Sequence, residues 1–123
     1  MVTHQIIGER RTTLSTEDLA TLRENLNEQR LFRREQLRQI AAASIDGATP
    51  PPRQTASRIE VRVKLAVSAR MVLADVEAAL RRMDQGCYGA CHLCRGAIGP
   101  ERLAVVPQAR YCGRCQQVRE AGR

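Results

Sequence analysis

Aromatic residues are scarce in this chain of 123 residues: Phe32, Tyr88 and Tyr111 are the only three, and there is no tryptophan. Because a wide globular core normally buries several aromatic rings, this scarcity argues against a thick β-sandwich or a large α/β enzyme. The apolar residues are mainly alanine, leucine, valine and isoleucine, which suits long helices packed along a narrow line of contact. We therefore expect a mainly α-helical protein of one domain, or of one small domain with an extension.

Long apolar runs are also missing. No run reaches the roughly 18–20 residues that cross a bilayer. The segment from Met1 to Arg11 lacks the basic start and apolar stretch of a signal peptide. We expect a protein without membrane segments that works in the cytoplasm.

Lysine is nearly absent, since Lys64 is the only lysine among 20 basic residues. Residues 1–46 hold seven basic and seven acidic side chains, whereas residues 47–123 hold thirteen and six, which accounts for the net charge of +7. Arginine makes two-pronged contacts with carboxylates and phosphates. The C-terminal part could therefore face an acidic partner or nucleic acid, and a plain solvated surface is the alternative.

Two long helices are expected. The first begins at Ser15, which can cap it, with Glu17 and Asp18 in the first turn, and continues without proline or glycine to Ile45. Its apolar residues recur every three or four positions, with Gln29 and Arg33 interrupting the same face. They are Leu19, Leu22, Leu26, Leu37 and Ile40.

The segment from Asp46 to Pro52, which holds three consecutive prolines, ends this helix. The second helix is expected to start at Ser57 with a capping box to Glu60, and to end at Gly86. Its heptad pattern consists of Leu65, Ala69, Val72, Val76, Ala79 and Met83. The alternation over residues 59–67 also fits a half-buried strand, but no partner strand is evident, so we predict helix.

Two matched helices joined by a proline-rich turn predict a long antiparallel coiled-coil hairpin, about 45 Å long at 1.5 Å per residue. Its tip comprises residues 46–57. A two-helix rod has little core of its own, so its base needs an anchor, and the cysteine-rich segment is next in sequence. We expect a flexible arm over residues 1–14, the hairpin over 15–85, and a small zinc-ribbon knob with a short C-terminal helix over 86–123.

Cys91, Cys94, Cys112 and Cys115 form two C-x2-C pairs with 17 residues between them. Two such pairs supply the four thiolates of a tetrahedral zinc site, and this spacing is typical of one. Four cysteine ligands leave no open coordination position, which predicts one structural Zn2+ and no catalytic metal. Redox-active disulfides are the alternative, but these usually occur singly beside a βαβ unit. His92 is either a substitute ligand or a solvent-facing residue.

Between the pairs, the segment Ile98–Pro107 suggests a turn, a short strand and a second turn, and Cys115–Glu120 can start the terminal helix. The fifth cysteine, Cys87, is either an ordinary half-buried residue or a redox thiol that attacks or replaces a metal ligand. Neighbouring Arg81 and Arg82 would favour its thiolate in the second case.

The sequence resembles the DksA/TraR family of bacterial zinc-finger transcription regulators. The residues that carry the resemblance are Ala79–Cys91, Cys94, Ile98, Glu101-Arg102-Leu103, Pro107 and Cys112-x2-Cys115-Gln116. The resemblance implies that Cys91, Cys94, Cys112 and Cys115 bind zinc. It also implies that the knob binds the rim of the secondary channel of RNA polymerase while the hairpin reaches down the channel. Some members of the family act together with ppGpp.

The tip departs from the family pattern. Fully active members usually have an acidic Asp-x-x-Asp-x-Ala-like motif there, whereas this chain has one carboxylate, Asp46, with Arg53 and Arg58 reversing the local charge. The remaining candidate residues of the tip are Gly47, Pro50, Pro51 and Pro52. Proline and alanine cannot act on a metal-containing active centre through Coulomb forces. The resemblance thus favours polymerase binding more than the usual regulatory output, and a plain rigid turn is the alternative for the prolines.

Two other functions remain open. A zinc ribbon could bind nucleic acid through phosphate contacts of Arg95, Arg102, Arg110, Arg114 and Arg119. No aromatic stacking platform is evident for it, and direct DNA binding is not expected. A thiol- or zinc-based redox sensor would use Cys87. No catalytic dyad or phosphate-binding glycine loop is visible, so we expect a non-enzymatic protein, and a hairpin that closes its own apolar face favours a monomer.

Overall fold

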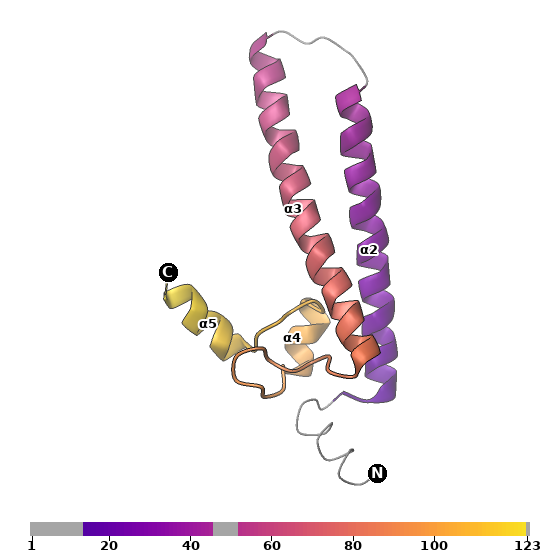
Figure 1. Ribbon diagram of the computed structural model, residues 1–123, viewed down its shortest axis with the longest axis vertical. Coiled ribbons are helices and arrows are strands. Elements are labelled where there is room, and N and C mark those ends of the chain that lie inside the picture. The colour runs from indigo at the N-terminus through magenta and orange to yellow at the C-terminus, as the bar shows by residue number, and fades with distance from the viewer. Residues whose placement is uncertain (1–13, 46–51, 123) are drawn as a thin grey trace.

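The computed structural model describes residues 14–45 and 52–122. In this part of the chain all the regular elements are helices: α2 (Thr16–Ile45), α3 (Pro52–Gln85), α4 (Pro100–Val105) and α5 (Gly113–Ala121). Figure 1 shows α2 and α3 as a long hairpin, with α4 beside the base of α3 and α5 pointing away from the hairpin. The predicted mainly α-helical fold is confirmed. None of the helices in the described ranges is both long and apolar enough to cross a membrane.

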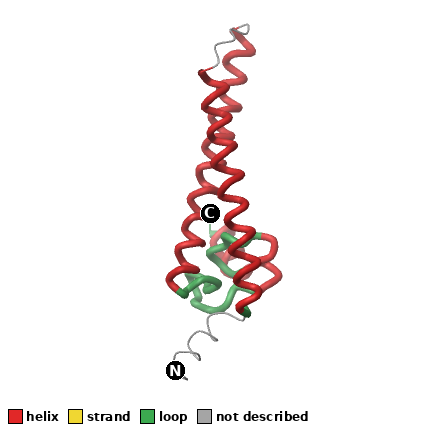
Figure 2. Tube along the Cα trace, turned by 90° about the vertical axis from the view of Figure 1, so that its right-hand side faces the viewer, coloured by secondary structure: helices red, strands yellow, loops and turns green. Residues whose placement is uncertain are grey.

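Helices α2 and α3 run antiparallel. Two ion pairs join them, from Arg23 to Asp84 (3.1 Å) and from Arg34 to Glu77 (2.8 Å). The later residue of α2 thus pairs with the earlier residue of α3, as expected for antiparallel helices. Figure 2, turned by 90°, shows the two helices overlapping in this view, and α2 and α3 pack against each other. Both pairs are largely exposed to solvent and contribute little to stability.

The ends of the long helices follow local rules. The Ser15 Oγ accepts from the backbone N–H of Asp18 (3.0 Å), and the Asp18 carboxylate accepts from the backbone N–H of Ser15 (3.2 Å), so the predicted cap is confirmed. At the other end, Gly86 has φ of +78°, and the backbone N–H groups of Gly86 and Cys87 donate to the carbonyls of Met83 and Arg82. This left-handed turn ends α3 as predicted.

The start of α3 was predicted wrongly. The helix begins at Pro52, five residues before the expected capping box at Ser57. Proline suits the first turn of a helix because its φ is already helical and the N–H it lacks would have had no partner there. Residues 52–56 of the expected tip therefore belong to α3. The other tip candidates, Asp46, Gly47, Pro50 and Pro51, and the arm over residues 1–13 lie outside the described residues.

The packed core lies at the base of the hairpin. Leu22 and Leu26 of α2 and Val76 and Ala79 of α3 are buried there in one cluster with side chains of the cysteine-rich knob (residues 86–122). The knob contributes Tyr88, Cys91, Ile98, Leu103 and Ala109. Because each fully buried aliphatic side chain is worth about 1.5–3 kcal/mol, this cluster anchors the knob to the hairpin.

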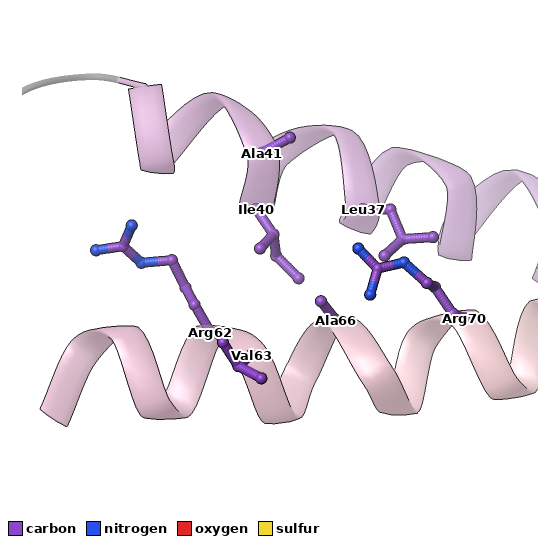
Figure 3. Close-up of a pocket in the computed structure, with 7 residues that line it drawn as sticks. All are labelled: Leu37, Ile40, Ala41, Arg62, Val63, Ala66 and Arg70. Atoms are coloured by element: carbon purple, nitrogen blue, oxygen red, sulfur yellow. The ribbon is translucent and has the colours of Figure 1, made fainter. Parts of the chain in front are cut away.

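Farther from the base, the contact between the helices loosens. Ala66 is buried against α2, whereas Leu65, which the heptad pattern assigned to that contact, is 46% exposed. A cavity of about 300 Å3 separates the helices here, between Leu37 and Ile40 of α2 and Ala66 of α3 (Figure 3). The short side chain of Ala66 does not fill the space between α3 and α2 at this level, so a cavity remains.

Leu26→Ala should lower the free energy of unfolding by about 2–5 kcal/mol, because Leu26 is fully buried where both helices meet the knob. Urea unfolding followed by circular dichroism measures the change. Leu31→Ala is the control, since Leu31 is 62% exposed on the same helix, and it should change stability by no more than about 0.5 kcal/mol. Equal losses for the two variants would contradict the position of the core.

Candidate metal centre

Four cysteines from two loops meet beside the base of the hairpin. Cys91 and Cys94 lie in the loop that follows α3, Cys112 is the N-cap of α5, and Cys115 lies in its first turn. The four Sγ atoms all lie within 4.8 Å of one another. The four residues that the sequence singled out are thus brought together.

Backbone turns aim the sulfurs of each pair at the same point. In the first turn the Cys91 N–H donates to the Gly96 carbonyl (2.8 Å), and Arg95, at φ of 65°, donates its N–H to the Cys91 carbonyl (3.0 Å). The Gly96 N–H then donates to the Cys94 Sγ (3.4 Å). In the second turn the Cys115 N–H donates to the Cys112 Sγ (3.5 Å). These hydrogen bonds fix the positions of the Cys94 and Cys112 sulfurs within the cluster.

The spacing of the sulfurs fits a tetrahedral ion. The Sγ atoms of Cys94 and Cys112 are 3.9 Å apart. A tetrahedron with metal–sulfur bonds of about 2.3 Å has edges of about 3.8 Å, whereas a disulfide is only about 2.05 Å long. Each of the five cysteines is a free thiol. The four cysteines are therefore arranged to bind one metal ion, and none of them forms a disulfide in this structure.

The electrostatics of the cluster call for a cation. Burial acts to raise the pKa of Cys91, but backbone hydrogen bonds from Cys94, Cys112 and Leu93 outweigh it and lower the pKa to about 6. The neighbouring Cys112 sulfur, burial and the other two sulfurs raise the pKa of Cys115 to about 12. Without a cation, Cys115 therefore stays protonated near neutral pH. A divalent ion bound by the four sulfurs would favour all four thiolates.

Two further candidates from the sequence lie outside the four-sulfur cluster. Cys87 is half-buried, and its Sγ lies 3.8 Å from the Gln85 Oε1. His92 is exposed, with its ring edge-on to Tyr111 at 5.9 Å between ring centroids. Partial burial and the charges of Arg82 and Arg110 lower the pKa of His92. His92 is therefore the solvent-facing residue of the two alternatives, and Cys87 is not part of the ligand set.

The fold has a counterpart among known structures. The structure is similar to that of the transcription factor DksA2 from Pseudomonas aeruginosa, with a TM-score of 0.73, 22% sequence identity, and coverage of 87% of this chain and 86% of that one. This chain has the DksA fold. With its four-cysteine cluster, it fits a DksA/TraR-like zinc-finger protein.

Similarity at the level of sequence covers a smaller part of the chain. An uncharacterised protein of Aquifex aeolicus (strain VF5) is 36% identical over 52 residues, which are 41% of this chain. The match spans 36% of the length of that relative. No family model matches the chain.

Within the DksA-like fold, the segment expected to form a strand between the cysteine pairs is helix α4, so this prediction was wrong. Pro100 occupies the first turn, and the Leu103 N–H donates to the Gly99 carbonyl (3.1 Å), which starts the helix. Leu103 is thereby buried against the hairpin base. A strand could not have turned this single side chain inward while leaving Val105 exposed, because both would lie on the same face.

Sequence reasoning missed Tyr88, which links the knob internally. Its ring is buried, and its hydroxyl donates to the Pro107 carbonyl at 2.7 Å. The sequence offered one signal for this role: Tyr88 is one of only three aromatic residues, and it lies between Gly86 and Gly89 just after α3. Tyr88 therefore ties the start of the knob to the segment that leads into the second cysteine pair.

The arginines proposed for nucleic-acid binding are largely used within the protein. The Arg110 guanidinium pairs with Asp75 of α3 (2.7 Å), the Arg102 Nε donates to the Tyr111 carbonyl (2.9 Å), and the Arg119 guanidinium lies 4.4 Å from the centre of the Tyr111 ring. Three of the five candidates thus support the knob and its contact with the hairpin. This weakens the nucleic-acid hypothesis.

Cys112→Ser should abolish stable metal binding, because a three-thiolate site loses both charge and tetrahedral closure. Metal analysis of the purified protein should give one ion per chain for the wild type and far less for this variant. Cys87→Ser is the matched control and should keep one ion per chain. Full metal content in Cys112→Ser, or loss of metal in Cys87→Ser, would show that the ligand set is wrong.

Tyr88→Phe should destabilise the protein by about 1–3 kcal/mol, because the buried Pro107 carbonyl loses its donor. Burial also raises the pKa of Tyr88 from 10.0 to about 12. The folded state therefore holds the Tyr88 proton more tightly than the unfolded state, so this contribution is complete below about pH 10 and lost toward pH 12. The difference in urea midpoint between the wild type and Tyr88→Phe should be smaller at pH 11 than at pH 8. The same difference at both pH values would contradict the assignment.

Proposed function

We propose that this protein is a non-enzymatic transcription regulator that binds RNA polymerase and inserts its hairpin into the secondary channel. The observation that carries the proposal is the combination of antiparallel helices of 30 and 34 residues with a four-cysteine knob at their base. The transcription factor DksA2 shares this fold over 87% of the chain. The resemblance of residues 77–116 to the DksA/TraR family supports the same proposal.

The proposed ion is one structural Zn2+. Four thiolates are soft ligands, and tetrahedral four-sulfur coordination is typical of zinc. In this proposal Cys91, Cys94, Cys112 and Cys115 hold the ion, which supplies charge neutralisation and a crosslink between the two loops. It takes no part in a reaction.

The dimensions of the hairpin suit a probe for a narrow channel. Helices of 30 and 34 residues extend about 45 and 51 Å at 1.5 Å per residue, and two helices side by side measure about 20–24 Å across. The buried cluster lies at the base, so the distal part is free of any other domain within the described residues. The protein would work in the cytoplasm as a monomer, with the knob on the polymerase surface.

The proposed output depends on the tip residues Asp46, Gly47, Pro50, Pro51, Pro52 and Arg53. A single carboxylate and a neighbouring arginine would act on the active centre differently from an acidic tip. The family resemblance makes ppGpp a candidate co-effector. Parallel transcription reactions with and without this nucleotide test its role.

The zinc-loaded protein should bind core RNA polymerase of its own organism and compete with a protein known to occupy the secondary channel. Fluorescence anisotropy of the labelled protein measures both binding and competition. Replacing residues 47–51 by glycine and serine leaves the described helices intact. This variant should bind with unchanged affinity but lose its effect on transcription in vitro.

The outcomes separate the steps of the proposal. Absence of binding near physiological salt would overturn the polymerase role, and binding without competition would overturn the channel position. An unchanged transcriptional effect of the tip variant would remove the tip from the mechanism. A zinc chelator added after binding tests whether the ion is structural.

A further inference from the structure

The distal part of α3 exposes an unusual amount of aliphatic surface. Six large apolar side chains between residues 59 and 71 are each 46–64% exposed, whereas only Ala66 and Ala69 of this stretch are buried. The six are Ile59, Val61, Val63, Leu65, Val67 and Met71. A helix that is apolar all round is normally covered by a partner.

The sequence pattern explains this exposure. Apolar residues alternate with others from Ile59 to Val67, and each step of two residues turns about 200° around a helix. The alternation therefore distributes apolar side chains around α3 instead of collecting them on the face toward α2. Packing against α2 covers one side of α3 and leaves the others exposed.

Two hollows give this surface a shape. The cavity between the helices, about 300 Å3, is bordered on α3 by Val63, Ala66 and Arg70 (Figure 3). A second, shallow hollow of about 420 Å3 lies along α3, bordered by Val63, Val67 and Met71 together with Lys64 and Asp75. Val63 borders both hollows, so they form one continuous surface, which we name the distal α3 face: Val63, Val67 and Met71, with Lys64 and Arg70.

The charges around the distal α3 face are mainly positive. Residues 57–75 contain four basic and two acidic side chains, and one of the acids, Asp75, pairs with Arg110 of the knob. Figure 3 shows the Arg70 side chain reaching from α3 toward α2 beside Leu37. Among the described residues, neither Lys64 nor Arg70 forms an ion pair. The face thus combines aliphatic hollows with cations that have no carboxylate partner in the described part of the protein.

We propose that the distal α3 face is a docking surface for a protein partner that presents aliphatic side chains together with carboxylates. This inference rests on the proposed function, and the partner is the polymerase surface that the inserted hairpin meets. Aliphatic side chains of the partner fill the two hollows, and its carboxylates face Lys64 and Arg70. Electrostatic complementarity of this kind sets the orientation and the rate of docking.

Other occupants fit the face less well. A second copy of the chain would bring two distal α3 faces of the same charge together, which is unfavourable. Nucleic acid would place phosphates against valine and methionine, and the face has no aromatic side chain on which a base could stack. Both become outcomes of the test.

The test compares two double variants of the full-length, zinc-loaded protein. Val63→Ser/Val67→Ser removes the centre of the face, whereas Val61→Ser/Leu65→Ser changes two side chains elsewhere around the same helix. The exposed fractions match closely, at 55% and 47% for the first pair and 53% and 46% for the second. Binding to core RNA polymerase should weaken on the order of tenfold for the first pair and less than about twofold for the second.

A third variant, Lys64→Gln/Arg70→Gln, tests the charges. It should weaken binding at low salt and make the affinity less sensitive to ionic strength than that of the wild type. Circular dichroism and thermal unfolding of every variant establish that the hairpin is intact. If the first pair unfolds the hairpin, Val63→Thr/Val67→Thr, which keeps the β-branched shape, replaces it.

The results distinguish this inference from the proposed function. If the wild type does not bind polymerase, both fail. If the wild type binds and the two double variants weaken binding equally or not at all, only the docking face fails. A wild-type dimer that Val63→Ser/Val67→Ser dissociates would assign the face to a second copy, and release of the protein from DNA by this variant would assign it to nucleic acid. Either result overturns the inference.

Discussion

Four thiols cannot all ionise in one small volume without a cation, and this constraint organises the knob. The Sγ atoms of the four cysteines lie within 4.8 Å of one another, and crowding raises the pKa of Cys115 to about 12. An ion that neutralises them joins the loop after α3 to the start of α5. In the same knob, α4 buries Leu103 and the Tyr88 hydroxyl donates to the Pro107 carbonyl. Such a crosslink would hold the knob together where it meets the base of the hairpin.

Stability and exposure are divided along the hairpin. The base holds fully buried side chains such as Leu26 and Val76, whereas the distal part has a cavity and half-exposed aliphatic residues. The buried side chains thus lie where the knob joins the helices, and the distal part, which would enter a partner, is left exposed. Exposed apolar surface bordered by charge is characteristic of interaction sites.

Local chemistry made much of this structure predictable. The Ser15 cap, the Gly86 turn and the C-x2-C pairs each depend on residues close together in the sequence, and each was predicted correctly. The errors arose where tertiary packing decided the outcome. Ala66, and not Leu65, faces α2, with a cavity between them, and α3 begins at Pro52 and not at Ser57. The contacts of Tyr88 with Pro107 and of Arg110 with Asp75 link segments 19 and 35 residues apart. No local pattern specifies such pairs.

The central claim is that an ion held by the four cysteines makes the knob a platform for presenting the hairpin to RNA polymerase. The most direct measurement is the affinity of one preparation for core polymerase in the metal-loaded state, after metal removal, and after zinc is restored. The account predicts that removal abolishes binding while the long helices remain largely folded, and that zinc restores the original affinity. Unchanged affinity in the metal-free protein would contradict it.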